Sequence, residues 1–152
     1  MSQPPFRLRP AAAADQAKIK AIIQAMRINP FGLKWSRFVL AVTGDDEMVG
    51  CGQVKPHGDG SRELASIAVC RQWRRQGVAR AIIEHLQAQH GAPLWLTCPS
   101  RRIPIYQKFG FCEVTKGQGL PLYFRLVYGM GWVLRPLLRD DNYLAIMIWE
   151  EP

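Results

Sequence analysis

The chain has 152 residues, of which 48% are hydrophobic, so we expect one folded core in a single domain spanning residues 1–152, not a disordered chain. Its longest uncharged apolar run, residues 126–134, is far shorter than the roughly 20 residues of a membrane-spanning helix, so no membrane span is expected. The net charge of +8 indicates attraction to polyanions, but nucleic acid is not an expected partner, because the basic residues are not interleaved with exposed aromatic side chains.

The first ten residues and the cysteines indicate the compartment. Residues 1–10 are polar and basic, which predicts that there is no signal peptide. The cysteines lack any C-x-x-C spacing, as the sequence shows at Cys51, Cys70, Cys98 and Cys112. We therefore expect reduced cysteines, no metal site and a cytoplasmic protein.

The N-terminal part of the chain predicts a strand, a helix and a hairpin. Residues 6–9 alternate in polarity and predict a first strand. Asp15 is a candidate helix N-cap, and the apolar residues that follow it recur at helical spacing until Asn29-Pro30 ends the pattern. Residues 37–43 and 48–54 are rich in apolar residues and flank a Gly-Asp-Asp turn, which predicts two strands joined as a hairpin.

The stretch 63–89 changes period in its middle. Residues 64–70 form a short run of small and β-branched residues that are nearly all apolar, which is typical of a strand buried on both faces. From Val78 onward the apolar residues recur at helical spacing, and Gly77 stands immediately before them. The turn between the two elements carries or adjoins four arginines: Arg71, Arg74, Arg75 and Arg80. Free backbone N–H groups at a helix N-terminus attract anions, so this turn predicts a site for a phosphorylated ligand.

The rest of the chain predicts further strands and one short helix. Residues 94–98 read as a buried strand, and residues 102–109 as a short helix that Gly110 ends. Residues 111–115 begin the next strand, and residues 143–149 are almost wholly apolar and form the last. Strands that alternate with helices in this way indicate an α/β domain.

Two motifs give the sequence a family resemblance. Residues 74–79 (RRQGVA) fit the pattern Gln/Arg-x-x-Gly-x-Gly/Ala of the GNAT superfamily of N-acetyltransferases, and residues 105–111 (IYQKFGF) are similar to its Leu-Tyr-x-Lys-x-Gly-Phe segment. The resemblance covers residues 38–114. It implies a mixed, mostly antiparallel central sheet of six to seven strands flanked by helices, with a long insert between the last two strands. It also implies an acetyl-CoA-dependent N-acetyltransferase that acts on a primary amine.

The resemblance also implies how acetyl-CoA would bind. The pantetheine chain would lie alongside the strand at Ile67, Ala68 and Val69, where a backbone N–H would hold the thioester carbonyl. The pyrophosphate would lie over the turn and the start of the helix, which contain the remaining predicted cofactor-binding residues: Arg74, Arg75, Gln76, Gly77, Val78, Ala79 and Arg80. No metal is needed for this chemistry.

Two side chains are the catalytic candidates. Tyr106 matches the family tyrosine that protonates the thiolate of CoA; the alternative is a packing tyrosine with a satisfied hydroxyl. Glu63 stands where many family members have an acid that accepts the amine proton, and the alternative is a surface charge at a strand end. His57, in a turn, and His85, on the polar face of the helix, are weaker candidates. A non-catalytic CoA-binding or regulatory domain with a polyanion-binding surface is the alternative function.

The connection between residues 115 and 142 is long, apolar and aromatic. Gly129, Gly131 and Pro136 predict that no single long helix forms there. Because such a composition must pack on something, three arrangements are open: a membrane interface, a homodimer contact or a cover over the acceptor site. The third would place aromatic side chains around the amine, with Arg125 or Arg135 available to an acidic group.

Overall fold

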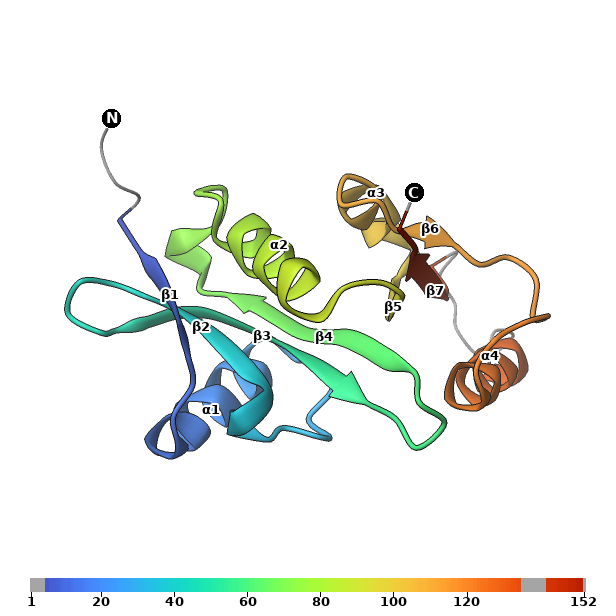
Figure 1. The fold of residues 1–152 in the computed structure, drawn as a ribbon, viewed down its shortest axis with the longest axis horizontal. Helices are drawn as coiled ribbons and strands as arrows, with labels where there is room; N and C mark the ends of the chain where they lie inside the picture. Colours follow the sequence, from blue (N-terminus) through green and yellow to red (C-terminus); the bar gives the residue numbers. More distant parts are fainter. Residues whose placement is uncertain (1–4, 135–141, 152) are drawn as a thin grey trace. The chain divides into compact units, whose positions relative to one another are not determined.

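A computed structural model describes residues 5–134 and 142–151, which form one seven-stranded sheet and four α-helices (Figure 1). The strands are β1 (Arg7–Pro10), β2 (Phe38–Val42), β3 (Met48–Pro56), β4 (Arg62–Val69), β5 (Leu94–Pro99), β6 (Cys112–Glu113) and β7 (Leu144–Trp149). The helices are α1 (Gln16–Ala25), α2 (Val78–His90), α3 (Ile103–Gln107) and α4 (Leu122–Leu134).

The strand order in the sheet is β1-β2-β3-β4-β5-β7-β6. Neighbouring strands with a described register are antiparallel except β4 and β5, which are parallel and pair at Glu63 and Trp95. This confirms the predicted fold, a mixed, mostly antiparallel sheet of an α/β domain with a long connection between its last two strands. None of the helices in the described residues has both the length and the hydropathy needed to cross a lipid bilayer.

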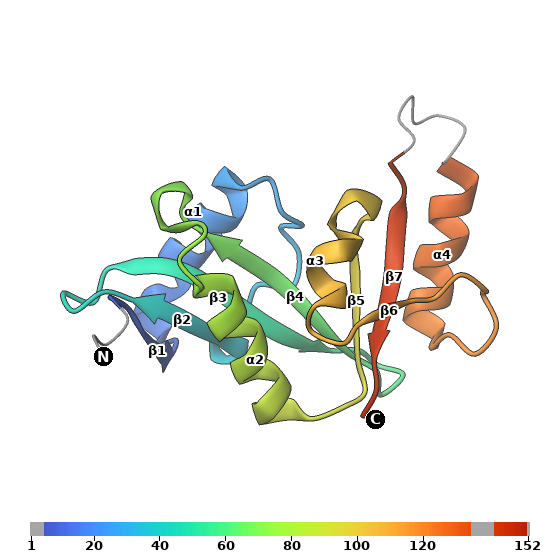
Figure 2. The same ribbon diagram turned by 90° about the horizontal axis from the view of Figure 1, so that it is seen from above.

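The residue contacts divide the chain into two compact units. Unit 1 comprises Met1–Lys55 and Leu64–His90, and unit 2 comprises Pro56–Glu63 and Gly91–Pro152. In unit 1, α1 and α2 lie on opposite faces of the strands, as Figures 1 and 2 show. The core on the α1 side includes Ile19 and Ile23 from the helix and Leu40 from β2, all fully buried.

Two glycines of β3 explain how α2 packs so close to the sheet. A Cβ atom placed on Gly52 would lie 2.6 Å from Ile82 of the helix and 2.6 Å from Ile67 of the neighbouring strand. A Cβ on Gly50 would lie 2.8 Å from Val78. Because real Cβ atoms do not approach other atoms this closely, only glycine at these positions permits the observed contact between strand and helix.

The predicted burial of β4 is wrong in part. We expected residues 64–70 to be buried on both faces, but after Leu64 buried and half-buried residues alternate along the strand. Ser66 and Ala68 are buried on one face, whereas Ile67 and Val69 are only partly covered on the other. A run of small and β-branched residues therefore does not by itself distinguish a strand with one open face from a fully covered strand.

Asp15 has a different role from the one the sequence suggested. It does precede α1, but its side chain makes no cap on that helix. It accepts the backbone N–H of Ala12 at 2.7 Å and two hydrogen bonds from the Arg9 guanidinium, at 2.8 and 3.1 Å. The Arg9 hydrogen bonds are the main reason why the pKa of Asp15 falls to about 2. The carboxylate thus ties the first strand to the turn before the helix.

We expect the Asp15→Asn substitution to lower the free energy of unfolding by about 2 kcal/mol at pH 7, because the side chain is nearly buried and its pKa is depressed. A depressed pKa contributes stability above the ordinary value of 3.8, and this contribution is lost as the pH falls toward 2. Urea unfolding at pH 7 and at pH 2.5 measures both effects. Asp45→Asn, an exposed carboxylate in the β2–β3 turn, is the control. Equal losses in the two variants would contradict the assignment.

Candidate functional site

In unit 1 the predicted order of strand, basic turn and helix is confirmed. Strand β4 ends at Val69, a 3₁₀ turn occupies Arg71–Trp73, and α2 begins at Val78, as the period change predicted. The candidate cofactor residues therefore form one continuous segment. Arg74, Arg75, Gln76, Gly77 and Arg80 are exposed, and Val78 is buried beneath them.

The backbone of this turn is shaped for close approach by a ligand. Gly77 has a φ of +81°, in the left-handed region, and a Cβ built on it would meet nothing within 4 Å. Arg75 also has a positive φ, +62°. The first hydrogen bond of α2 runs from the N–H of Ala81 to the carbonyl of Gly77, so the preceding N–H groups face outward from the helix end. These donors, the helix dipole and the arginines together suit a phosphate group.

A distortion in β4 was not predicted from the sequence. Ser66 has a φ of +59°, which is uncommon for a residue other than glycine and marks a local irregularity in the strand. Gln53 of β3 donates from Nε2 to the Ser66 hydroxyl at 2.8 Å and to the Gly32 carbonyl at 3.2 Å. The three candidate pantetheine-contacting residues, 67–69, follow this irregularity directly, and nothing in the residue types of the strand signals it.

In unit 2, Tyr106 lies on α3, which packs on one face of β5 and β7, while α4 lies on the other (Figure 2). Its ring is half-buried and meets Phe111 edge to face, with 6.2 Å between ring centres. Burial raises the pKa of Tyr106, with a further contribution from Cys98. The hydroxyl therefore stays protonated at neutral pH, which is the state that a proton donor needs.

Glu63 is not a surface charge. It is 5% exposed, and its Oε2 lies 2.8 Å from Nε2 of His57, the residue that sequence reasoning ranked below it. His85, by contrast, is exposed on α2, as predicted. The pairing of His57 with Glu63 depends on the length of the β3–β4 hairpin, a signal that the sequence offers only weakly.

The insert forms a helix that its glycines do not interrupt, which corrects the prediction for Gly129 and Gly131, while Pro136, the third predicted interruption, lies outside the described residues. Helix α4 runs through both Gly129 and Gly131. Arg125 is exposed and donates to the carbonyl of Leu120, and Arg135, the other cation predicted to meet an acidic group, lies outside the described residues.

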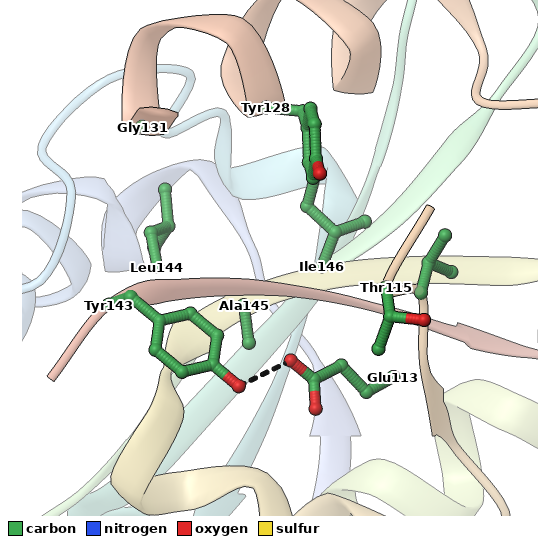
Figure 3. A pocket seen from close by; sticks show the side chains of 9 residues that line it. Glu113, Thr115, Tyr128, Gly131, Tyr143, Leu144, Ala145 and Ile146 are labelled. Atoms are coloured by element: carbon green, nitrogen blue, oxygen red, sulfur yellow. Dashed lines mark hydrogen bonds between the residues drawn. The ribbon is translucent and has the colours of Figure 1, made fainter. Parts of the chain in front are cut away.

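A cavity of about 260 Å³ lies between α4 and strands β6 and β7 (Figure 3). Its polar wall carries Tyr143, whose hydroxyl donates to Oε1 of Glu113 at 2.6 Å, and Tyr128 faces the cavity from the helix. Leu144, Ala145 and Ile146 supply an apolar wall. Neither Glu63 nor Tyr106 lines this cavity, so the structure does not join it to the candidate catalytic residues.

Comparison with solved structures identifies the fold. N-acetylglutamate synthase from Neisseria gonorrhoeae, complexed with coenzyme A and N-acetyl-glutamate, is similar with a TM-score of 0.71 at 17% identity over 99% of this chain. Rv2747 from Mycobacterium tuberculosis, in complex with CoA, gives 0.70 at 17% identity and covers 96% of this chain and 99% of its own. The ribosomal-protein-S18-alanine N-acetyltransferase from Escherichia coli gives 0.61 at 19% identity, covering 97% of this chain and 96% of its own.

The chain spans about a third of the length of the Neisseria synthase chains, 36% in one structure and 33% in another. No curated protein sequence matches it significantly. The model of the acetyltransferase (GNAT) domain matches residues 34–113, close to the range of the resemblance in the sequence. Because this match covers more than half of the 152 residues, the chain belongs to the GNAT acetyltransferase family.

Proposed function

We propose that this chain is an acetyl-CoA-dependent N-acetyltransferase that transfers the acetyl group to a primary amine by direct attack in a ternary complex. The observation that carries the proposal is the segment from β4 to α2. At the N-terminus of that helix, the backbone of Gly77 is accessible to a ligand and lies in a segment with four arginines. Membership of the GNAT family and the CoA bound in structures of the same fold support it.

In this proposal the backbone of unit 1 binds the cofactor. The N–H groups from Arg75 to Ala79 donate to the pyrophosphate, and the nearby guanidinium groups neutralise its charge. Residues 67–69 of β4 hydrogen-bond the pantetheine amides, as an added strand would. A backbone N–H near Val69 donates to the thioester carbonyl oxygen and stabilises the negative charge that develops there during transfer.

Two side chains of unit 2 handle the protons. As the amine nitrogen bonds to the carbonyl carbon, Glu63 accepts the proton that the amine must lose, directly or through water. The carbon–sulfur bond then breaks, and Tyr106 donates its hydroxyl proton to the departing thiolate. The raised pKa keeps the Tyr106 phenol protonated beforehand, so the proton is in place when the thiolate departs.

The acceptor belongs to the class of primary amines. The Neisseria synthase structure contains N-acetyl-glutamate, and the Escherichia coli enzyme is named for an alanine of a ribosomal protein, so amino acids and protein N-termini are both reasonable acceptors to test. Free thiol released from acetyl-CoA with amino acids, polyamines, lysine peptides and N-terminal peptides measures the activity. Release that depends on one amine class supports the proposal. CoA binding without release from any amine would favour the alternative, a non-catalytic CoA-binding domain.

We expect Tyr106→Phe to lower kcat by about 100-fold, on the scale of a lost general acid, with little change in CoA affinity. Initial rates at saturating acetyl-CoA measure kcat, and calorimetry measures the affinity. Tyr143→Phe is the matched control, because it removes another half-buried hydroxyl from unit 2. An unchanged kcat in a folded Tyr106→Phe protein would make Tyr106 a packing residue.

A further inference from the structure

The candidate base and its histidine partner belong to one hairpin. His57 directly follows β3, and Glu63 is the second residue of β4. The turn between them is closed by hydrogen bonds from the His57 N–H to the Ser61 carbonyl, 2.9 Å, and from the Gly60 N–H to the His57 carbonyl, 3.0 Å. Both side chains are mostly covered, 14% exposed for His57 and 7% for Glu63. A buried carboxylate needs a hydrogen-bond donor, and His57 supplies one.

Two aromatic residues of the insert pack against the imidazole of His57. The ring of Tyr123, in the first turn of α4, stacks on His57 with 3.6 Å between ring centres and 13° between planes. Phe124 meets the same imidazole edge to face at 5.8 Å. These contacts restrict rotation of the imidazole, because two aromatic rings already pack against it.

A second contact holds the start of α4 on the same hairpin. The backbone N–H of Tyr123 donates to Oδ2 of Asp59 at 2.9 Å, which satisfies one of the donors that a helix leaves unpaired at its N-terminus. Ser61 donates to the other oxygen of Asp59, from its N–H at 2.8 Å and from its hydroxyl. Within the described part of the chain, the ionisable groups that face His57 are Glu63 on β4, Asp59 in the turn and Tyr123 on α4.

The geometry assigns different roles to the two oxygens of Glu63. In the proposed function Glu63 is a base, and a base carboxylate only accepts hydrogen bonds. In that state Nε2 of His57, 2.8 Å from Oε2, carries the proton and donates it to the hydrogen bond. Among the residues that the structure describes, the hydrogen bond to the Glu63 carboxylate goes to Oε2, so Oε1 is the oxygen left to accept a proton.

We propose that His57 and Tyr123 are positioning residues for Glu63: the insert helix stacks on His57, and His57 holds Oε2 of Glu63 so that Oε1 faces the amine. The inference rests on the proposed function. It makes the insert part of the catalytic arrangement through His57, beyond any contact that it makes with the acceptor.

The test compares Tyr123→Leu, which removes the stacked ring, with Tyr123→Phe, which keeps it. We expect Tyr123→Leu to lower kcat up to about tenfold, since an aromatic contact contributes about 0.5–1.5 kcal/mol, and to alter the pH–rate profile. The acceptor KM and the Kd for CoA should change less than about twofold. Tyr123→Phe should behave as the wild type, because stacking does not need the hydroxyl.

Double variants separate positioning from general damage. Because Tyr123 acts through Glu63, Tyr123→Leu should have no further effect on kcat in the Glu63→Gln background. An equal loss of kcat in both backgrounds would overturn the proposal, and so would an unchanged kcat and pH–rate profile in Tyr123→Leu. His57→Gln, whose amide can still donate to Glu63, should retain more activity than His57→Leu.

A spectroscopic readout keeps this inference separate from the proposed function. The chain has three histidines, so nitrogen-15 NMR can assign His57 by its absence in His57→Gln. We expect the Nε2–H tautomer of His57 in the wild type and loss of that preference in Glu63→Gln and Tyr123→Leu. If no amine is acetylated, the proposed function fails while this result still stands. If the tautomer is the same in all three proteins, the positioning role fails, whatever the activity.

Discussion

Replacing Gly77 with glutamate is expected to abolish CoA binding. The backbone at Gly77 is left-handed and open, and in our proposal the pyrophosphate lies against it. A glutamate side chain would occupy that space, strain the turn and add a negative charge beside the phosphates. We expect the Kd for CoA to rise at least about 100-fold, which is about 2.8 kcal/mol of binding free energy.

Titration calorimetry with CoA measures this change, and circular dichroism and thermal unfolding show whether the variant is folded. Gly119→Glu is a matched control: Gly119 has nearly the same φ, +83°, and a Cβ there also meets nothing within 4 Å, but it lies in unit 2. It carries the same backbone strain and the same change in net charge. If folded Gly77→Glu bound CoA as tightly as Gly119→Glu, the pyrophosphate would not lie over residues 75–79.

The sequence predicted this segment well because its signals are local. The change from a short apolar run to helical spacing at Val78 depends only on residues close in the chain, and so does the arginine-rich turn before it. The boundaries of α2 and β4 in the structure agree with those signals to within a few residues. The binding roles of these residues stay predictions, since they come from the family resemblance.

The features that the sequence missed depend on contacts between distant residues. The role of His57 depends on two contacts. The hairpin places Glu63 within hydrogen-bond distance of it, and Tyr123, 66 positions later in the chain, stacks on it from α4. Ser66 adopts a left-handed φ that its residue type does not favour, and its hydroxyl accepts a buried hydrogen bond from Gln53. Neither feature has a periodicity or a motif that a single sequence could show.

Helix α4 illustrates a third limit. Gly129 and Gly131 each disfavour a helix by about 1 kcal/mol relative to alanine, which is why we predicted an interruption. The structure keeps the helix because its start packs against the sheet: Phe124 of α4 and Leu120, two residues before the helix, are buried with Trp95 and Ile146 in one cluster. Tertiary packing of this kind outweighs an unfavourable propensity, since most helical stability in proteins comes from the packed face.

The same helix also has an exposed apolar face. Leu122, Leu126 and Met130 recur every four residues, and each is more than half exposed. Phe124, between them in sequence, is fully buried and stacks on Trp95 with 5.2 Å between ring centres. Truncation to alanine on the buried face of this helix should therefore cost much more stability than truncation on its exposed face.

We expect Phe124→Ala to lower the free energy of unfolding by about 3–5 kcal/mol, the usual cost of truncating a buried phenylalanine, since it leaves a cavity against Trp95 and removes the edge contact with His57. Leu126→Ala, two residues along the same helix and 61% exposed, should change it by less than about 0.5 kcal/mol. Urea unfolding followed by tryptophan fluorescence measures both.

A loss below about 1 kcal/mol for Phe124→Ala would mean that α4 is not packed on the sheet in solution. A large loss for Leu126→Ala would mean instead that its exposed face is covered, as in the homodimer contact that the sequence left open.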